Sequence, residues 1–318
     1  MSTAARSLRI LMGITTCFCL LPFFSLAQAP ATARPAAPAA ASAGAAIDEI
    51  VIRSGAVYRG KVLSATVKGV KIELPGRGSF DVPREQIDHI MMSPPAAIVK
   101  GIQAYERGSM KEAIATLKLA IFQFQGMDTD WAVKGLLCYA RACLADRNLP
   151  EAEKAFTTFL DTYPDHDNKR DADIGLAELE IERKQYDVAL SNLLEMVTTY
   201  DEMLKPEGEL LRQAAQLNRD IAQCYLGLER PEDALDSFTK VIALYPWPDY
   251  YPETLYAAAE LSARLGRLQR ADLIYSELLE NYKEFPKYRD ASREQNAIRQ
   301  KLAAAEAQDA GAGAAQGK

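Results

Sequence analysis

An alanine followed four residues later by a bulky apolar residue recurs five times along this chain, each time inside an amphipathic helical pattern. The spacings between successive alanines are 39, 37, 45 and 37 residues. Repeats of this period are typically built from two helices, which stack because a single repeat cannot bury its apolar face. The pattern predicts a helical solenoid of about five repeats over residues 94–307, with the pairs Ala113/Leu117, Ala152/Phe156, Ala189/Leu193, Ala234/Phe238 and Ala271/Tyr275.

A second small residue lies twelve positions before each of these alanines, namely Gly101, Ala140, Ala177, Ala222 and Ala259. Pro164 and Pro246 each follow a tyrosine where a second helix is expected to end, because proline lacks an amide hydrogen and disfavours helix before it. This combination resembles the tetratricopeptide repeat (TPR) family. The resemblance implies that the two small residues of a repeat meet where its helices cross.

The third repeat departs from the pattern, since Asp201 replaces the terminal proline. The longest spacing follows it and contains the turn-forming run 205–208, so one connection between repeats is expected to be long. A polar amphipathic helix over 284–305 is expected to cap the last repeat. Residues 308–318, rich in Gly, Ala and Gln, are predicted to be a disordered tail.

The TPR resemblance implies that the first helices of the repeats line a concave groove. The first repeat contributes Ile98, Ile102 and Tyr105, unless the preceding domain covers them. The mixed charges of the polar members favour a partner segment that carries both acidic and basic residues. These candidate partner-binding residues are Lys134, Arg141, Glu178, Arg219, Gln223, Tyr256, Glu260 and Arg264.

Residues 47–93 alternate apolar and polar positions in short runs separated by glycines, which indicates about five antiparallel strands. A domain this small is expected to curl into a barrel. The run 50–62 followed by 69–74 resembles the first half of Sm-like and SH3-like barrels. The expected loop Ser64–Thr66 lacks the Asp/Asn arrangement with which Sm proteins bind RNA, so a structural or self-associating barrel is favoured over an RNA reader.

Residues 1–27 have the pattern of an export signal: Arg6 and Arg9, an uncharged apolar run, and small residues Ser25 and Ala27 before the expected cleavage point. An uncleaved anchor is the alternative, and Pro22 within the run argues against it. Residues 28–46 are almost entirely Ala and Pro and are expected to form a disordered linker. The chain is therefore expected in the periplasm or cell envelope.

Loss of residues 1–27 would change the formal charge from −6 to −8, which disfavours non-specific nucleic-acid binding. Three cysteines lie in the helical region: Cys138, Cys143 and Cys224. They are interpreted as small core residues. A disulfide between Cys224 and one of the others is the alternative in an oxidising compartment.

Signatures of an enzyme are absent from the sequence, and no cofactor or metal site is predicted. The two histidines, His89 and His166, lie in different domains. His166 is flanked by Asp165 and Asp167, which could suggest a metal loop, but a solvated turn between repeats is favoured. Three alternate glutamates over 178–182 spread around a helix and are interpreted as a solvated face.

Residues 245–252 combine four aromatic residues with three prolines. A rigid connection packed on neighbouring helices is favoured over an exposed aromatic platform for a peptide or glycan.

These observations favour a non-enzymatic scaffold that holds a partner protein or peptide in the cell envelope. A self-assembling structural protein that forms homo-oligomers through the barrel is the alternative. The hypothesis of an exported enzyme is the least favoured.

Overall fold

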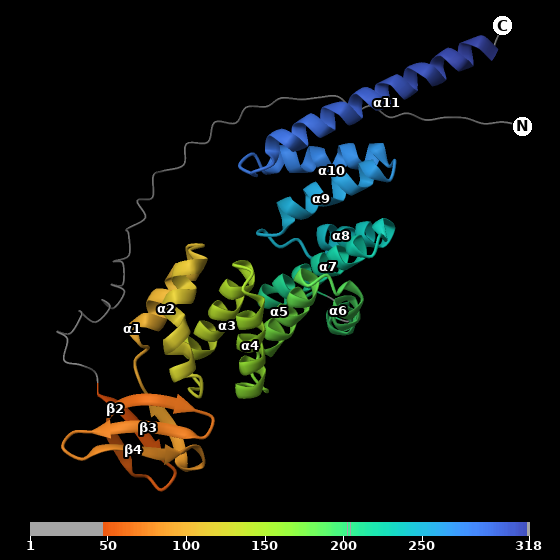
Figure 1. Ribbon diagram of the computed structural model, residues 1–318. Coiled ribbons are helices and arrows are strands. Elements are labelled where there is room, and N and C mark those ends of the chain that lie inside the picture. Colours follow the sequence, from red (N-terminus) through yellow and green to blue (C-terminus); the bar gives the residue numbers. More distant parts are fainter. Residues whose placement is uncertain (1–46, 202, 204, 317–318) are drawn as a thin grey trace, which may run out of the picture. The chain divides into compact units, whose positions relative to one another are not determined.

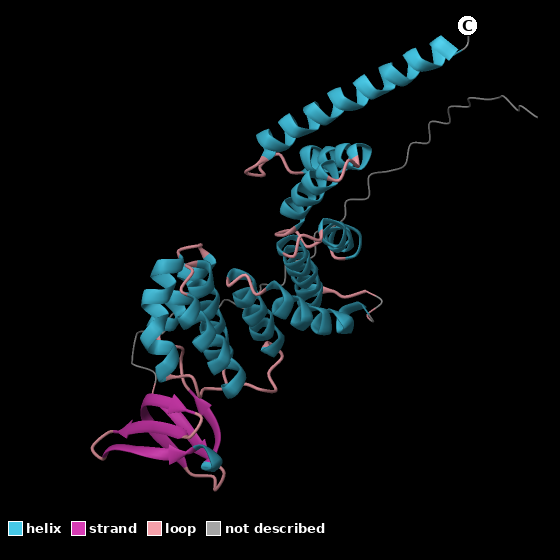
Figure 2. Ribbon diagram, turned by 45° about the vertical axis from the view of Figure 1, so that its right-hand side comes forward, coloured by secondary structure: helices cyan, strands magenta, loops and turns pink. Residues whose placement is uncertain are grey.

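The computed structural model describes residues 47–201, 203 and 205–316, which contain five strands, one short 3₁₀ helix and eleven α-helices (Figures 1 and 2). The predicted signal and linker lie outside the described residues. The predicted fold class, a TPR-like helical solenoid preceded by a small β domain, is confirmed.

The β domain is an antiparallel sheet of five strands in the order β4-β3-β2-β1-β5. Apolar residues that alternate along the strands form its core, and Ile50, Ile72 and Val82 are each at most 2% exposed. The strands are β1 (Asp48–Ile52), β2 (Val57–Thr66), β3 (Gly69–Leu74), β4 (Gly78–Pro83) and β5 (Ile87–Met91), and the 3₁₀ helix η1 (Arg84–Gln86) precedes β5.

The turn between β2 and β3 lies later than the sequence predicts. Ser64, Ala65 and Thr66 belong to β2, and the chain turns at Val67 and Lys68. Ala65 is fully buried and pairs with Val70, so the apolar alternation continues beyond the expected loop. The expected loop position at 64–66 was therefore wrong.

The helices form five successive hairpins and a final helix. Each helix packs on the next, and the first helices of repeats one to four also contact one another in sequence, α1 on α3, α3 on α5 and α5 on α7. The hairpins are α1 (Ala96–Glu106) with α2 (Met110–Gln123), α3 (Asp130–Ala145) with α4 (Leu149–Thr162), α5 (Lys169–Glu182) with α6 (Tyr186–Asp201), α7 (Gly208–Gly227) with α8 (Pro231–Leu244) and α9 (Tyr251–Arg264) with α10 (Leu268–Asn281), followed by α11 (Tyr288–Gln316).

All ten small residues that define the repeat are buried, and each alanine among them is at most 2% exposed. The bulky residues that follow are at most 4% exposed. A Cβ on Gly101 would lie 2.4 Å from the side chain of Leu117, and a Cβ on Gly175 would lie 2.2 Å from the ring of Phe156. Close helix approach thus requires small residues opposite the bulky ones.

The turn inside each repeat contains a residue in the left-handed region, seven positions after the first small residue. In the first and last repeats it is glycine, Gly108 and Gly266, with φ of 77° and 74°. In the other three it is Arg147, Lys184 or Glu229, with φ of 57–61°. Two backbone hydrogen bonds close each turn, as when Lys184 N donates to Ile181 O at 2.8 Å and Gln185 N donates to Glu180 O at 2.8 Å. This is the Schellman ending of a helix.

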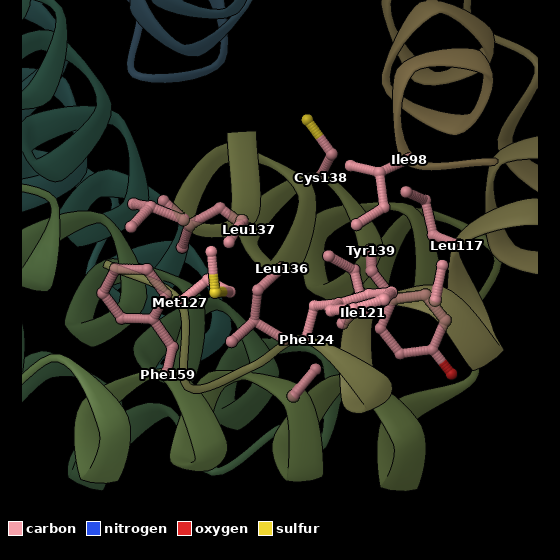
Figure 3. Packing of buried hydrophobic residues seen from close by; sticks show 14 of the residues in the cluster. Ile98, Leu117, Ile121, Phe124, Met127, Leu136, Leu137, Cys138, Tyr139 and Phe159 are labelled. Atoms are coloured by element: carbon pink, nitrogen blue, oxygen red, sulfur yellow. The ribbon is translucent and has the colours of Figure 1, made fainter. Parts of the chain in front are cut away.

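The interior of the first repeats is continuous and apolar (Figure 3). Ile98 of α1, Ile121 of α2 and Leu136 of α3 are at most 1% exposed and join one cluster that extends to Phe159 of α4. Ile98 is therefore a core residue and not a groove residue.

The last helix is longer than predicted. α11 begins at Tyr288 and continues to Gln316, where the sequence predicts a disordered tail from residue 308. The prediction differs because alanine, common in this segment, has the highest helix propensity of all residues. Ala291 and Ile298 of α11 pack against the fifth repeat, as expected of a capping helix.

Candidate functional site

A cavity of about 370 Å³ lies along the first helices of repeats one to four. Four of the candidate residues line it: Arg141 of α3, Glu178 of α5, and Arg219 and Gln223 of α7. Tyr105 of α1 also contributes to the wall. The stacking of the first helices brings these side chains together, and within α7 Arg219 and Gln223 share one face because they are four residues apart.

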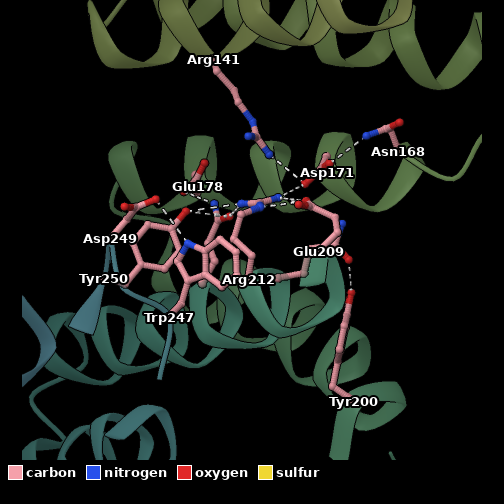
Figure 4. Close-up of polar contacts among 12 residues, drawn as sticks. Arg141, Asn168, Asp171, Glu178, Tyr200, Glu209, Arg212, Trp247, Asp249 and Tyr250 are labelled. Carbon is pink, nitrogen blue, oxygen red and sulfur yellow. Dashed lines mark hydrogen bonds and ion pairs between the residues drawn. The ribbon is translucent and has the colours of Figure 1, made fainter. Parts of the chain in front are cut away.

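Arg141 also belongs to a largely buried ionic network (Figure 4). Its Nη2 donates to Asp171 Oδ1 at 2.8 Å, and Arg212 of α7 donates to the same oxygen. Arg212 Nε also donates to Glu209 Oε1 at 2.8 Å. The side chain of Asp171 is 5% exposed and that of Arg141 is 26% exposed. Arg141 is therefore held by structural partners rather than solvated in a groove.

Glu178 and Gln216 connect the network to the cavity. Gln216 Nε2 donates to Glu178 Oε1 at 2.7 Å, and Gln216 Oε1 accepts from Arg212 Nη1 at 2.7 Å. Glu178 therefore lines the cavity and has a hydrogen-bond partner in Gln216. The interpretation of residues 178–182 as a solvated face did not include this contact.

Two residues that line the cavity also have buried polar atoms without partners. Among the described residues, the buried atoms Arg219 Nε and Asp220 Oδ2 have no hydrogen-bond partner. Arg219 Nη2 lies 3.9 Å from Asp220 Oδ1, an ion pair too long for a hydrogen bond. Burial raises the pKa of the Asp220 carboxyl well above its usual range, and the nearby charge of Glu178 raises it further, while Arg219 opposes the shift.

The aromatic segment 245–252 packs against the repeats. Tyr245 is 4% exposed, and Trp247 and Tyr250 pack on the cluster formed by the third and fourth repeats. Trp247 Nε1 donates to Asp249 Oδ2 at 3.3 Å (Figure 4). Tyr250 lines the cavity. The segment is a packed connection, as favoured from the sequence, and one of its rings also reaches the candidate site.

The remaining candidates lie outside this cavity. Lys134 is exposed and donates to Glu106 Oε1 at 2.6 Å. Tyr256 and Glu260 of α9 line a second hollow of about 290 Å³, which Arg219 and Gln223 join from α7. Arg264 is exposed at the end of α9 and lines neither hollow.

The cysteines and histidines have structural surroundings. Cys138, Cys143 and Cys224 are buried free thiols, and burial raises the pKa of each, to about 11 for the first two and about 12 for Cys224. His166 Nδ1 accepts from the backbone N–H of Asn168 at 3.0 Å, as in a turn. Over the described ranges, no group of three His, Cys, Asp or Glu side chains is placed to hold a metal ion.

Sequence reasoning missed the residues that complete the site, namely Asp171, Arg212, Gln216, Asp220 and Tyr250. A signal for three of them, Arg212, Gln216 and Asp220, existed. Polar residues lie three or four positions apart along α7 and therefore share one face of this largely buried helix. They are Arg212, Gln216, Arg219, Asp220 and Gln223.

Within the part of the chain that the structure describes, none of the helices combines the length and apolar composition needed to cross a lipid bilayer.

Comparison with known proteins finds a tetratricopeptide repeat within the helical region. The profile of the tetratricopeptide repeat family matches residues 220–246, which span the end of α7, all of α8 and the start of the aromatic segment. No curated protein matches the sequence.

Among solved structures, the chain is similar to a thermophilic TPR protein of Thermus thermophilus, with 20% identity and a TM-score of 0.44 over 65% of this chain and 98% of that one. It is also similar to a double mutant of MamA from RS-1, with 17% identity and a TM-score of 0.41 over 61% of this chain and 99% of that one.

Proposed function

We propose that this chain is a non-enzymatic scaffold of the bacterial cell envelope that holds a partner protein or peptide on the first helices of its repeats. The observation that carries the proposal is the cavity walled by α1, α3, α5 and α7, where charged and aromatic side chains converge. Stacked helical repeats characteristically present such surfaces to other chains. Export is supported by the signal-like pattern of residues 1–27.

The groove extends from this cavity to the second hollow, where Gln223 and Glu260 are exposed. Exposed positions suit a test because their substitution changes stability little, usually within about 0.5 kcal/mol. The double variant Gln223→Lys with Glu260→Lys alters the groove. The matched control is Gln269→Lys with Asp236→Lys, two exposed positions on the second helices of the same repeats.

The wild type and both variants are used to capture cross-linked partners from the native envelope. We expect the groove variant to lose the partner that the wild type and the control retain. Equal capture by all three would contradict a groove in this position. Fractionation that finds the native protein only in the cytoplasm would contradict the envelope location.

Self-assembly through the β domain is the competing function. The strand order ends at β4 and β5, and the edge of a sheet can pair with another chain. Analytical ultracentrifugation distinguishes the two: a defined oligomer that dissociates on charge substitution in β4 or β5 favours self-assembly.

A further inference from the structure

The pairing of charges around the main cavity leaves one carboxyl group without a permanent cationic partner. Arg141 and Arg212 pair with Asp171 and Glu209, and Arg147 pairs with Glu182. Two carboxyl groups then remain, Glu178 and Asp220, with a single guanidinium, that of Arg219. A buried unpaired carboxylate is strongly unfavourable, so the site is electrostatically suited to one added cation.

The hydrogen-bonding capacity of the cavity agrees with this charge balance. Asp220 has a side chain that is 2% exposed, and its Oδ2 has no partner. Glu178 accepts from the neutral Gln216, and a carboxylate has about four acceptor positions. Acceptors for further donors therefore remain on two carboxyl groups of one cavity wall.

The apolar part of the wall suits an extended hydrocarbon stem. Leu144, Ala145 and Ile181 line the cavity beside the carboxyl groups, and the ring of Tyr105 is also part of the wall. An ammonium is a compact charge on a flexible four-carbon stem that can lie along the apolar wall, whereas a guanidinium needs acceptors aligned with its planar fork of donors. The combination of an apolar wall and two carboxyl groups matches lysine.

Building on the proposed scaffold function, we propose that this cavity is a specificity pocket that receives one lysine side chain of the partner, with its ammonium held between Glu178 and Asp220. The lysine anchors the partner segment, and the exposed residues of the second hollow contact its neighbouring residues.

Binding of the lysine ammonium releases the proton of the Asp220 carboxyl. The charged groups that act on Asp220 are Glu178 on α5 and Arg219 on α7, and the raised pKa of the carboxyl means that it holds its proton more tightly than an exposed aspartate does. The ammonium replaces that proton, which leaves to solvent. Affinity therefore increases as the pH rises, until Asp220 is ionised in the free protein as well.

The test compares two capped amino acids on the purified protein by isothermal titration calorimetry. The first is N-acetyl-lysine N-methylamide. The second is N-acetyl-norleucine N-methylamide, which has the same stem without the ammonium. We expect the lysine compound to bind at least tenfold more tightly and to release a proton, detected as a heat that depends on the ionisation enthalpy of the buffer at pH 7.

Asp220→Asn removes the acceptor charge with little change in shape and should abolish the preference for lysine. Glu178→Gln provides a second, less buried variant with the same expected result. Asp173→Asn is the matched control, because it changes a carboxylate on α5 that pairs with Lys169 outside this cavity.

The lysine pocket is overturned if the two compounds bind equally, if neither binds, or if Asp220→Asn keeps the preference. These outcomes are separable from failure of the scaffold function. A partner that is still captured through Gln223 and Glu260, while lysine shows no preference, would leave the scaffold intact and remove only the pocket.

Discussion

Asp171 of α5 accepts a hydrogen bond from Arg141 of α3, with 2.8 Å between Asp171 Oδ1 and Arg141 Nη2. The contact joins the second repeat to the third, and Arg212 extends it to the fourth through the same oxygen. A single carboxylate therefore links three consecutive repeats on the side where the cavity lies.

Replacing Asp171 with Asn should lower the free energy of unfolding by about 2 to 3 kcal/mol, because two guanidinium groups lose their shared anion. Breaking a fully buried pair costs ~3–5 kcal/mol, and the figure here is smaller because part of Arg141 is exposed. Urea denaturation measures the change. Asp173→Asn is the control, since its exposed pair with Lys169 should contribute less than about 1 kcal/mol. Equal effects of the two substitutions would contradict the linking role of Asp171.

Ala234→Leu should destabilise the fourth repeat by about 1 to 3 kcal/mol, because added methylene groups would force apart the closely packed helices α7 and α8. Ala234 is 0% exposed. Ala243→Leu makes the same change at an exposed position of α8 and should leave the melting temperature nearly unchanged. Thermal unfolding followed by circular dichroism compares the two. An unchanged melting temperature for Ala234→Leu would mean that the repeat register is wrong.

The fold was predictable because its determinants are local and periodic. Ala152 and Phe156 mark a second helix by their spacing alone, and at Gly101 the neighbouring helix lies so close that only a residue without a Cβ fits. The turn after β2 was misplaced because strand length depends on the pairing of Ala65 with Val70, which no local signal reveals.

The sequence predicted only some of the residues of the site, because it indicates which helix face a residue lies on but not which residue of another repeat it contacts. Arg141, Glu178 and Arg219 follow from helix periodicity within each repeat. The sequence does not predict their hydrogen-bond partners, because Asp171 and Arg212 belong to different repeats that come into contact only when the repeats stack. Burial also depends on the stacked structure, so the sequence did not distinguish the ion-paired Arg141 from the exposed Arg264.

Lys184→Gly should stabilise the protein by about 0.5 to 1 kcal/mol. Lys184 has a φ of 61°, a conformation that costs a non-glycine residue ~1–2 kcal/mol and costs glycine nothing, while the greater freedom of glycine in the unfolded chain offsets part of the gain. Gly266→Ala is the opposite change at the equivalent turn of the fifth repeat, where φ is 74°, and should destabilise. Denaturant midpoints of both variants are measured, and a change of the same sign in both would refute the argument.

Asp220→Asn should stabilise the protein at neutral pH and have little effect near pH 4. The folded protein raises the pKa of the Asp220 carboxyl well above its usual value of 3.8, chiefly through burial, so it binds the proton more tightly than the unfolded chain does. The contribution of this group to stability is therefore fully present below pH 3.8 and is lost as the pH rises towards the raised pKa. An asparagine at this position cannot ionise, so the variant does not lose stability in this way as the pH rises. Melting temperatures of the variant and the wild type at pH 4, 5.5 and 7 should diverge steadily, whereas Asp173→Asn should show no such divergence. A constant difference across this range would show that Asp220 is ionised in the folded protein and that its carboxylate has found a partner.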